Sequence, residues 1–492
     1  MKKYIFKFLI ALPLVFSCVS CDLDINDNPN FPANASTDML IPSGISWTSA
    51  RLGRDLQLVG SLWSQHYAQN NSSSQYGSMD VYDIVNSDFD ALWLAAYAGA
   101  LPDLYLARKQ AESSSQWGYW IQTQVLIAFN YHVLVDFYGT IPFSQAISEE
   151  FPQPKYDDGK EINTGIIALL DAAIAKKADA TAVGQASLKE KDFVFSGDIT
   201  KWIQFAKTLK LKVLMRDFEA NKSAIQTLLN ENDFLTSDAK MNGFTDKENN
   251  SNPLYESDRR KLNTKNNIKA SATLITFLKA YNDPRIEDFF ERGIVGNEFV
   301  GLPQGGYSLA AATIDPNSTS RAKLDATDPV YFQSVVESDF LQAECYARLG
   351  DKVKAKTFYN AGVTAAFKRW FHDASTFIAP EGVYAFDDTN LDSMLKSILT
   401  QKWVASTRCQ AWDSFFDINR TGYPNMGSQY TVLDTDWTTS NPEYIVGELT
   451  PNVGSVLGTG YPKRLLIPKA SSDYNANAPA VIKITEKMWW QK

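Results

Sequence analysis

The chain has 492 residues, enough for one large domain or two ordinary ones. Its 47 basic and 56 acidic residues give a net charge of −9, which argues against binding nucleic acid or anionic lipid by charge. With 12 Trp, 22 Tyr and 28 Phe, it has enough aromatic residues for a stacking surface as well as a core.

Residues 1–20 are predicted to be a lipoprotein signal peptide. Two lysines precede an apolar run from Tyr4 to Phe16, which is too short for a membrane span. A cysteine after a small residue at the end of such a segment resembles a bacterial lipobox, so we expect a diacylated Cys21 that holds the protein at a membrane. Cys18 is a competing site, and cleavage without lipid is a further alternative. Cys21 is preferred because the polar chain begins directly after it.

Helical periodicity dominates the chain that follows. Trp117 to Tyr138 is apolar at nearly every helical spacing, which predicts a central helix buried on several sides and ended by Gly139 and Pro142. The other predicted helices cover residues 43–54, 55–69, 88–112, 164–177, 201–218, 340–350, 352–370, 391–408 and 411–419. In the segment 340–370, Gly350, Ala355, Tyr359 and Gly362 resemble the packing residues of a tetratricopeptide repeat.

Two stretches lack this regularity. Between residues 238 and 328 only 272–281 has a clear helical pattern, and the tail after 420 is rich in loops with scattered strands. The sequence therefore predicts an all-α protein in which residues 21–492 form a single domain. Its helical scaffold would lie mainly in 40–237 and 332–420, with an irregular region at about 238–331 and 421–492.

Catalytic signatures are absent from the sequence. Only three histidines are present, and there is no H-E-x-x-H motif, G-x-S-x-G elbow or phosphate loop. The cysteines have no metal-binding spacing, so we expect no catalytic residues, no metal and no cofactor. A surface glycoside hydrolase with two carboxylates is the enzymatic alternative, because 56 acidic residues supply many neighbouring pairs.

The segment Asp136 to Ser144, DFYGTIPFS, resembles the D-x-Y-G-x-I-P signature of SusD/RagB-like outer-membrane lipoproteins. Trp63 to Gln69 looks most like the subgroup of SusD-like nutrient binders. Further segments fall in the family's order: Trp202 to Arg216, Asp283 to Arg285, Ala343-Glu344, Gln401 to Trp403, Trp412-Asp413, Arg420 to Pro424 and Pro462 to Pro468. One departure is Lys469, which stands where many relatives have a glutamate.

The resemblance implies an all-α SusD-like fold of four tetratricopeptide-like helix pairs with a loop-rich irregular region. It implies a cell-surface protein anchored in the outer membrane through Cys21, with a SusC-like TonB-dependent transporter as its partner. Such proteins bind oligosaccharide for import and are not enzymes; peptide or another nutrient is the alternative ligand. No interaction with nucleic acid is implied.

Ligand-binding residues should lie in loops that the scaffold positions. A sugar ring needs an aromatic face, together with amides, carboxylates or Arg that bind its hydroxyls. We expect the ligand face to combine segment 63–82 with the irregular region, through Trp63, Gln65, Tyr67, Asn70, Asn71, Gln75, Tyr76, Tyr82, Tyr307 and Asn317. The alternative is that Trp63 and Tyr67 are core residues beside a solvated loop.

Overall fold

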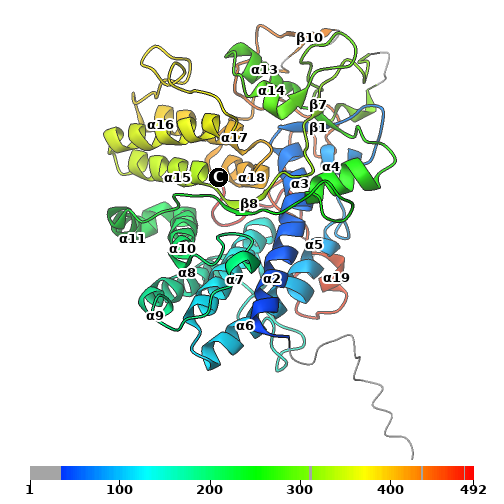
Figure 1. The fold of residues 1–492 in the computed structure, drawn as a ribbon. Helices are drawn as coiled ribbons and strands as arrows, with labels where there is room; N and C mark the ends of the chain where they lie inside the picture. The colour runs from blue at the N-terminus through cyan, green and yellow to red at the C-terminus, as the bar shows by residue number, and fades with distance from the viewer. Residues whose placement is uncertain (1–34, 310–312, 431, 434–435, 481) are drawn as a thin grey trace, which may run out of the picture. The chain divides into compact units, whose positions relative to one another are not determined.

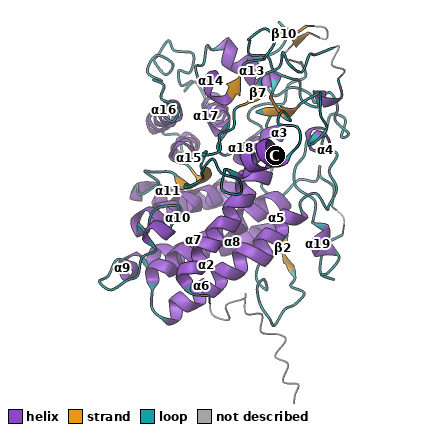
Figure 2. Cartoon of the chain, turned by 45° about the vertical axis from the view of Figure 1, so that its right-hand side comes forward, coloured by secondary structure: helices purple, strands orange, loops and turns teal. Residues whose placement is uncertain are grey.

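The computed structural model of the protein describes residues 35–309, 313–430, 432–433, 436–480 and 482–492. Residues 37–492 form one compact unit. The expected signal peptide and Cys21 lie outside the described residues. Helices dominate the unit and its strands are short, which confirms the all-α prediction (Figures 1 and 2).

The helices fall into two groups along the chain. The first comprises α2 (Thr37–Arg51), η2 (Leu52–Leu56), α3 (Gln57–Trp63), α4 (Gly77–Asp80), α5 (Asp90–Ala95), η3 (Ala96–Ala100), α6 (Leu101–Ser113), α7 (Trp117–Tyr138), α8 (Gly159–Ala175), α9 (Lys177–Ala180), α10 (Ile199–Leu214) and α11 (Phe218–Glu231). The second comprises α12 (Pro253–Tyr255), η6 (Glu256–Lys261), α13 (Ala272–Ala280), α14 (Ile286–Phe289), α15 (Val335–Arg348), α16 (Lys352–Lys368), α17 (Leu391–Ser406), α18 (Ala411–Thr421) and α19 (Lys469–Ser472). Short 3-10 turns complete the set at Lys189–Lys191, Met215–Asp217 and Gly306–Ser308.

Short antiparallel strands join distant parts of the chain. One sheet has the order β1-β5-β7-β6, and three two-stranded pairs are formed by β2 with β3, β4 with β8, and β9 with β10. The strands are β1 (Tyr67–Gln69), β2 (Ile141–Pro142), β3 (Tyr156–Asp157), β4 (Ala239–Met241), β5 (Ile268–Ala270), β6 (Phe290–Glu291), β7 (Arg321–Ala322), β8 (Val330–Gln333), β9 (Val432–Leu433) and β10 (Asp436–Ser440). The pairing of β1 with β5 brings segment 67–69 against the irregular region.

The central helix α7 has the bounds that the sequence predicts. It packs against α2, α6, α8 and α10, so its apolar side chains are buried on several sides. Gly139 ends it with a φ of 76°, a conformation that glycine adopts without steric cost. Arg464 donates a hydrogen bond to the carbonyl of Tyr138 and so satisfies one of the free carbonyls at this helix end.

Helices from the two parts of the chain occupy different parts of the unit. Figures 1 and 2 show α6, α7 and α8 in the lower part of the view and α13, α14, α16 and α17 in the upper part. The predicted tetratricopeptide-like pair is α15 with α16, which pack closely together, and α15 also packs against α17. Gly362 makes this close approach: a Cβ there would come within 3.0 Å of the Phe340 ring.

Three differences from the sequence-based expectation have a clear local description. The predicted helix 55–69 ends at Trp63, because Gln65 has a φ of 56° and the chain continues as β1. The predicted helix 88–112 begins at Asp90, and the carboxylate of Asp88, before it, accepts from the amide of Val85. Helix α11 was not predicted; Asp217, whose side chain accepts from the amide of Ala220, caps its start.

A network of buried ion pairs connects four helices around Lys402 of α17. Its ammonium lies 2.8 Å from Asp413 and 2.7 Å from Asp417, both of α18. Lys212 of α10 lies 2.7 Å from Glu337 of α15 and 2.5 Å from the same Asp413. Burial lowers the pKa of Lys402, but the three surrounding carboxylates outweigh this effect and raise it, so Lys402 stays charged.

A bidentate pair extends this network. Arg420 of α18 reaches the two carboxylate oxygens of Glu344 of α15 at 2.6 and 2.7 Å. Burial opposes ionisation of Glu344, but Arg420 and Arg348 outweigh it and hold the pKa of Glu344 well below its usual value. Charges this deeply buried are stable only when they are paired. These ion pairs therefore constrain how the four helices lie relative to one another.

We expect Arg420→Met to lower the free energy of unfolding by about 3–5 kcal/mol, because the Glu344 carboxylate would stay buried with only Arg348 beside it. Urea unfolding followed by circular dichroism measures this change. Asp179→Ala, which removes an exposed pair with Lys176, is the control and should change the stability little. Equal stability of the Arg420 variant and the wild type would contradict this role of the network.

Candidate functional site

The structure divides the ten predicted ligand residues into two groups. The side chains of the first five are buried: Trp63, Gln65, Tyr67, Asn70 and Tyr82. Those of the other five are partly or fully exposed: Asn71, Gln75, Tyr76, Tyr307 and Asn317. The structure does not support direct ligand contact by the first five, because their side chains have almost no surface open to solvent. For Trp63 and Tyr67 the alternative interpretation, that they are core residues, describes the structure.

Gln65 joins three segments of the chain by hydrogen bonds. Its Nε2 donates to the carbonyl of Thr450 at 2.7 Å. Its Oε1 accepts from the amide of Thr450 at 2.9 Å and from the hydroxyl of Thr273 at 2.6 Å. The side chain therefore fixes the start of the predicted ligand segment against the irregular region. Gln65 is therefore a buried structural contact of this segment.

Trp63 and Tyr82 belong to an aromatic cluster beneath the same segment. The Trp63 indole donates to the carbonyl of Met79 at 3.0 Å, and its ring meets the edge of Tyr82 with centroids 6.3 Å apart. Tyr82 in turn packs edge-on against Tyr461 at 6.0 Å. The sequence predicts Tyr82 in a ligand face, but the chain turns at this residue, which has a φ of 67°, and directs its ring inward.

Tyr67 and Asn70 hold the turn that leads into the exposed loop. Tyr67 lines an internal cavity of about 20 Å³, which has room for about one water molecule. Within the described part of the chain, its hydroxyl makes no hydrogen bond. The side-chain Nδ2 of Asn70 donates to the carbonyl of Asn266 at 2.5 Å, which ties this turn to the chain before β5.

The exposed loop 71–77 does meet the irregular region. Asn71 donates to the carbonyl of Ile314 at 2.8 Å. The ring of Tyr307 lies against Gly77, where a Cβ would come within 2.7 Å of the ring, so only glycine fits there. Gln75 is exposed between these two contacts. The structure thus brings Asn71, Gln75 and Tyr307 to one rim.

Asn317 lies in a different turn. Its carbonyl accepts from the amide of Val295 at 3.0 Å, and its own amide donates to the carboxylate of Asp315 at 2.9 Å. The side chain is exposed. The contacts of Asn317 itself connect it to Val295, while Ile314, directly before the turn, is the residue that contacts the loop 71–77.

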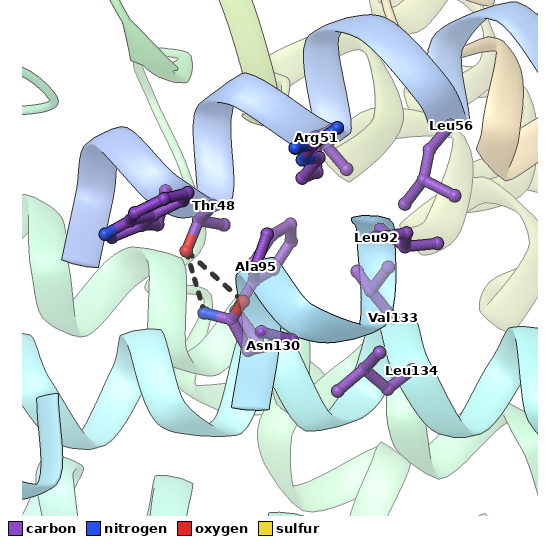
Figure 3. Close-up of a pocket in the computed structure, with 12 residues that line it drawn as sticks. Thr48, Arg51, Leu56, Leu92, Ala95, Asn130, Val133 and Leu134 are labelled. Carbon is purple, nitrogen blue, oxygen red and sulfur yellow. Dashed lines mark hydrogen bonds between the residues drawn. The ribbon is translucent and has the colours of Figure 1, made fainter. Parts of the chain in front are cut away.

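The cavity shown in Figure 3 is too small for a sugar ring. It lies between α2, α5 and α7, and its volume is about 30 Å³, close to that of one water molecule. Leu56, Leu92 and Leu134 line it, and the hydroxyl of Thr48 and the amide of Asn130 bond to each other at 2.9 Å. It is a gap in the core packing.

A larger cavity of about 520 Å³ lies between α2, η2 and the segment from β4 to η6. This volume falls in the range that binds small ligands. We call it the polar cavity; the residues that matter for its chemistry are Ser49, Arg51, Arg54, Phe244, Asn249, Glu256, Ser257 and Lys261. Its half-buried aromatic side chain, Phe244, stands in a loop that is otherwise exposed and polar.

Three buried polar atoms in the lining of the polar cavity lack a hydrogen-bond partner among the described residues. They are the hydroxyl of Ser49, Nε of Arg51 and Oε1 of Glu256. These atoms are closed off from solvent, so a ligand in the cavity would contact the other polar groups of the lining. The lining side chains include hydroxyl, amide, carboxylate and basic groups, which makes a polyhydroxylated ligand chemically suitable.

Two charged side chains of the polar cavity, Lys261 and Glu256, lie close together. The ammonium of Lys261 donates to Oδ1 of Asn249 at 2.9 Å and lies 3.7 Å from Glu256. Burial opposes ionisation of Glu256, but the hydrogen bond from Ser251 and the nearby basic groups lower its pKa, so it is a carboxylate at neutral pH. Arg54 is half exposed and only 3.3 Å from Asp55, which leaves most of its donors to solvent.

Tyr76 connects the predicted ligand segment to the polar cavity. Its hydroxyl donates to Oδ1 of Asp258 at 3.2 Å, one residue after the cavity-lining Ser257. Burial and the carboxylate of Asp258 raise the pKa of Tyr76, while the positive charge of Arg54 opposes this shift. The loop 71–77 therefore lies beside the cavity, and Tyr76 stays protonated as a hydrogen-bond donor.

The acidic groups of the polar cavity bear on whether it could hydrolyse a glycan. Of the described residues that line it, only Glu256 has a carboxylate, whereas glycoside hydrolysis uses two. A search of the described residues for three or more His, Cys, Asp or Glu placed to hold a metal ion finds none.

Of the residues in or beside the polar cavity, sequence reasoning named Tyr76 but not Arg54, Phe244, Glu256 and Lys261. The usable signal was Phe244, a single aromatic in the polar segment Asn242 to Ser251. Such an aromatic has few local neighbours to pack against, which marks it as a candidate contact residue. Arg54 gave no such signal, because a basic residue in a helical pattern is ordinary.

We expect Trp63→Ala to lower the free energy of unfolding by about 3–5 kcal/mol, because it empties a fully buried site beside Tyr82 and Phe415. Gln75→Ala, in the exposed loop, should stay within about 0.5 kcal/mol of the wild type. Urea unfolding of both variants measures these changes. Similar midpoints for the two would show that Trp63 is not a core residue.

Comparison with known proteins gives a family and a fold. The model of a SusD-like family, described as "Starch-binding associating with outer membrane", matches residues 37–442. A comparison with curated protein sequences found no match. Among the helices that the structure describes, none is long and apolar enough to cross a membrane.

Solved structures share this fold at low identity. A SusD/RagB family protein from Bacteroides thetaiotaomicron is 22% identical, with a TM-score of 0.70, and the match covers 93% of this chain and 99% of that one. A SusD homologue from Bacteroides uniformis is 20% identical, with a TM-score of 0.69 over 92% and 99% of the two chains. A chitin-binding SusD homologue from Flavobacterium johnsoniae is 20% identical, with a TM-score of 0.72 over 92% and 98%.

Proposed function

The chain belongs to the SusD-like family, and from this premise we propose that it is a cell-surface lipoprotein that binds a glycan and delivers it to a TonB-dependent transporter of the outer membrane. It acts as a binding protein and not as an enzyme. The observation that carries the proposal is the polar cavity beside Tyr76. Its aromatic side chain and its polar side chains suit the apolar face and the hydroxyl groups of a sugar ring.

The class of ligand follows from the chemistry of the lining. Phe244 offers an apolar face, and Arg54, Asn249, Ser257 and Lys261 offer donors and acceptors for hydroxyl groups. The family description names starch, and the neighbour from Flavobacterium johnsoniae is named as chitin-binding, so both relatives point to polysaccharides. A peptide ligand is the outcome that would redirect the proposal within the same architecture.

The membrane attachment rests on the N-terminal sequence. Cys21 closes a short apolar leader and would carry the acyl chains that hold the protein in the outer membrane, facing the exterior. The net charge of −9 argues against attachment to anionic lipid by charge, so the lipid anchor would supply the attachment. A SusC-like transporter is the partner that family membership suggests.

We expect Phe244→Ala to weaken glycan binding at least about fivefold, because one stacking contact contributes about 1 kcal/mol. Native electrophoresis through gels containing soluble starch, glycol chitin or one of a panel of plant and bacterial polysaccharides measures the retention. Phe371→Ala is the matched control, because Phe371 is 96% exposed and lines neither the polar cavity nor Figure 3's pocket.

Three results of that experiment would decide the proposal. The proposal is supported if the gel retains the wild type and the Phe371 variant, and retains the Phe244 variant less strongly at an unchanged melting temperature. Equal retention of all three proteins would remove the polar cavity from consideration. Retention of the wild type by none of the polysaccharides, together with binding to a peptide library, would replace the glycan by a peptide.

We expect Cys21→Ala to move the protein from the membrane fraction to the soluble fraction, because the variant lacks the acylated residue. The wild type, extracted in detergent, should co-purify with a TonB-dependent transporter that mass spectrometry identifies. Cys18→Ala is the control and should leave both results unchanged. Membrane attachment lost only in the Cys18 variant would assign the lipid to Cys18, and a wild type purified alone would contradict the transporter.

A further inference from the structure

A second cleft, of about 450 Å³, lies between α13, α17 and the segment that carries Tyr384. None of its lining residues lines the polar cavity. Both helices belong to the upper part of the unit in Figure 1, whereas the polar cavity lies against α2. None of the ten ligand-binding residues predicted from the sequence lines this cleft. We call it the aromatic cleft.

One wall of the aromatic cleft is a cluster of three aromatic rings. Tyr281 is half exposed, and its ring centroid lies 4.7 Å from that of Phe277 and 5.5 Å from that of Tyr384. Phe277 and Tyr384 are buried behind it and are nearly parallel, with 8° between their planes. Tyr281 is thus the exposed member of a supported stack.

Buried hydrogen bonds and an ion pair support this wall. The hydroxyl of Tyr384 donates to Oδ2 of Asp283 at 2.7 Å, and Asp283 is itself paired with Arg285 at 2.6 Å. The hydroxyl of Tyr359 donates to the carbonyl of Tyr384 at 2.9 Å. Rings held by such buried contacts lose little further freedom when a ligand stacks on them.

The opposite wall is a row of polar side chains on α17. Ser393, Lys396, Ser397 and Thr400 line the cleft at spacings of three or four residues, so they share one face of the helix. Asp387 adds a carboxylate from the loop before the helix. Within the described part of the chain, the Lys396 ammonium forms no ion pair, so it is available to a ligand.

We propose that the aromatic cleft is a second glycan-binding site, in which Tyr281 stacks on a sugar ring and the polar row of α17 binds its hydroxyl groups. An apolar ligand would leave these polar groups without partners, whereas a sugar ring presents an apolar face to Tyr281 and hydroxyls to α17. This inference rests on the proposed function for its class of ligand. Its site and its residues are separate from those of the polar cavity.

Two separate sites on one protein have a measurable consequence. A long polysaccharide can occupy both, and the second contact then forms within one complex, so retention of the polymer exceeds that of a short fragment. A variant in which the polar cavity binds more weakly, such as Phe244→Ala, should therefore keep a residual affinity for the polysaccharide. That residual affinity should disappear when the aromatic cleft is also altered.

The test combines variants of both sites in the full mature chain, with the polysaccharide gels described above. Phe244→Ala should leave residual retention, and adding Tyr281→Ala should abolish it. Lys396→Ala, which changes an exposed side chain away from the aromatic stack, should reduce the residual retention at least about threefold. Lys356→Ala, an exposed lysine of α16, is the matched control and should have no effect.

Each outcome bears on one proposal. Residual retention that survives in the Phe244/Tyr281 and Phe244/Lys396 double variants would overturn the second site and leave the proposed function standing. Retention abolished by Phe244→Ala alone would also overturn the second site. If no polysaccharide retains the wild type, the glycan-binding function fails and the second site fails with it. Melting temperatures of all variants exclude loss of binding through unfolding.

Discussion

The buried charges between α10, α15, α17 and α18 constrain the rest of the structure. Lys212, Lys402 and Arg420 face Glu337, Asp413, Asp417 and Glu344 at distances of 2.5 to 2.8 Å in their closest pairs. Removing these charges from water costs several kcal/mol for each ion, and only a complete set of partners offsets that cost. The four helices are therefore stable together in one arrangement, and a helix shifted along its neighbour would leave a carboxylate or an ammonium unpaired.

This arrangement also fixes the segments from which ligand sites are built. Helix α18 packs against α3, and Gly60 of α3 allows the contact, because a Cβ there would lie 2.3 Å from the backbone of Trp412. The chain leaves α3 at a fixed place, and Gln65 then binds it to Thr273 and Thr450. The loop 71–77 starts from a turn anchored on both sides. Its exposed side chains can vary without disturbing the helices beneath it.

The sequence predicted the regular parts of this fold because they obey local rules. Helix α7 is apolar all round and ends at Gly139, so its bounds follow from neighbouring residues alone. Gln65 could not be interpreted in that way, since the partner that decides its role, Thr450, lies 385 residues away. The same holds for Tyr82, whose ring is directed inward by a left-handed backbone conformation that its side chain gives no reason to expect. An amide or aromatic in a polar loop suggests a ligand contact and a structural contact equally well.

The two proposed sites depend on the scaffold in different ways, and this difference bears on how each would bind a glycan. The wall of the aromatic cleft is supported by a buried ion pair between Asp283 and Arg285, so its shape is fixed before a ligand arrives. The polar cavity is closed on one side by the exposed segment 242–250, where Phe244 is held by a loop and not by a helix. A preformed site loses little freedom on binding and suits a common sugar unit, whereas a loop-built site can adjust to the linkage and branching of a particular glycan. Selectivity would then reside mainly in the loop that contains Phe244, and the aromatic cleft would add affinity for any chain that carries the same ring.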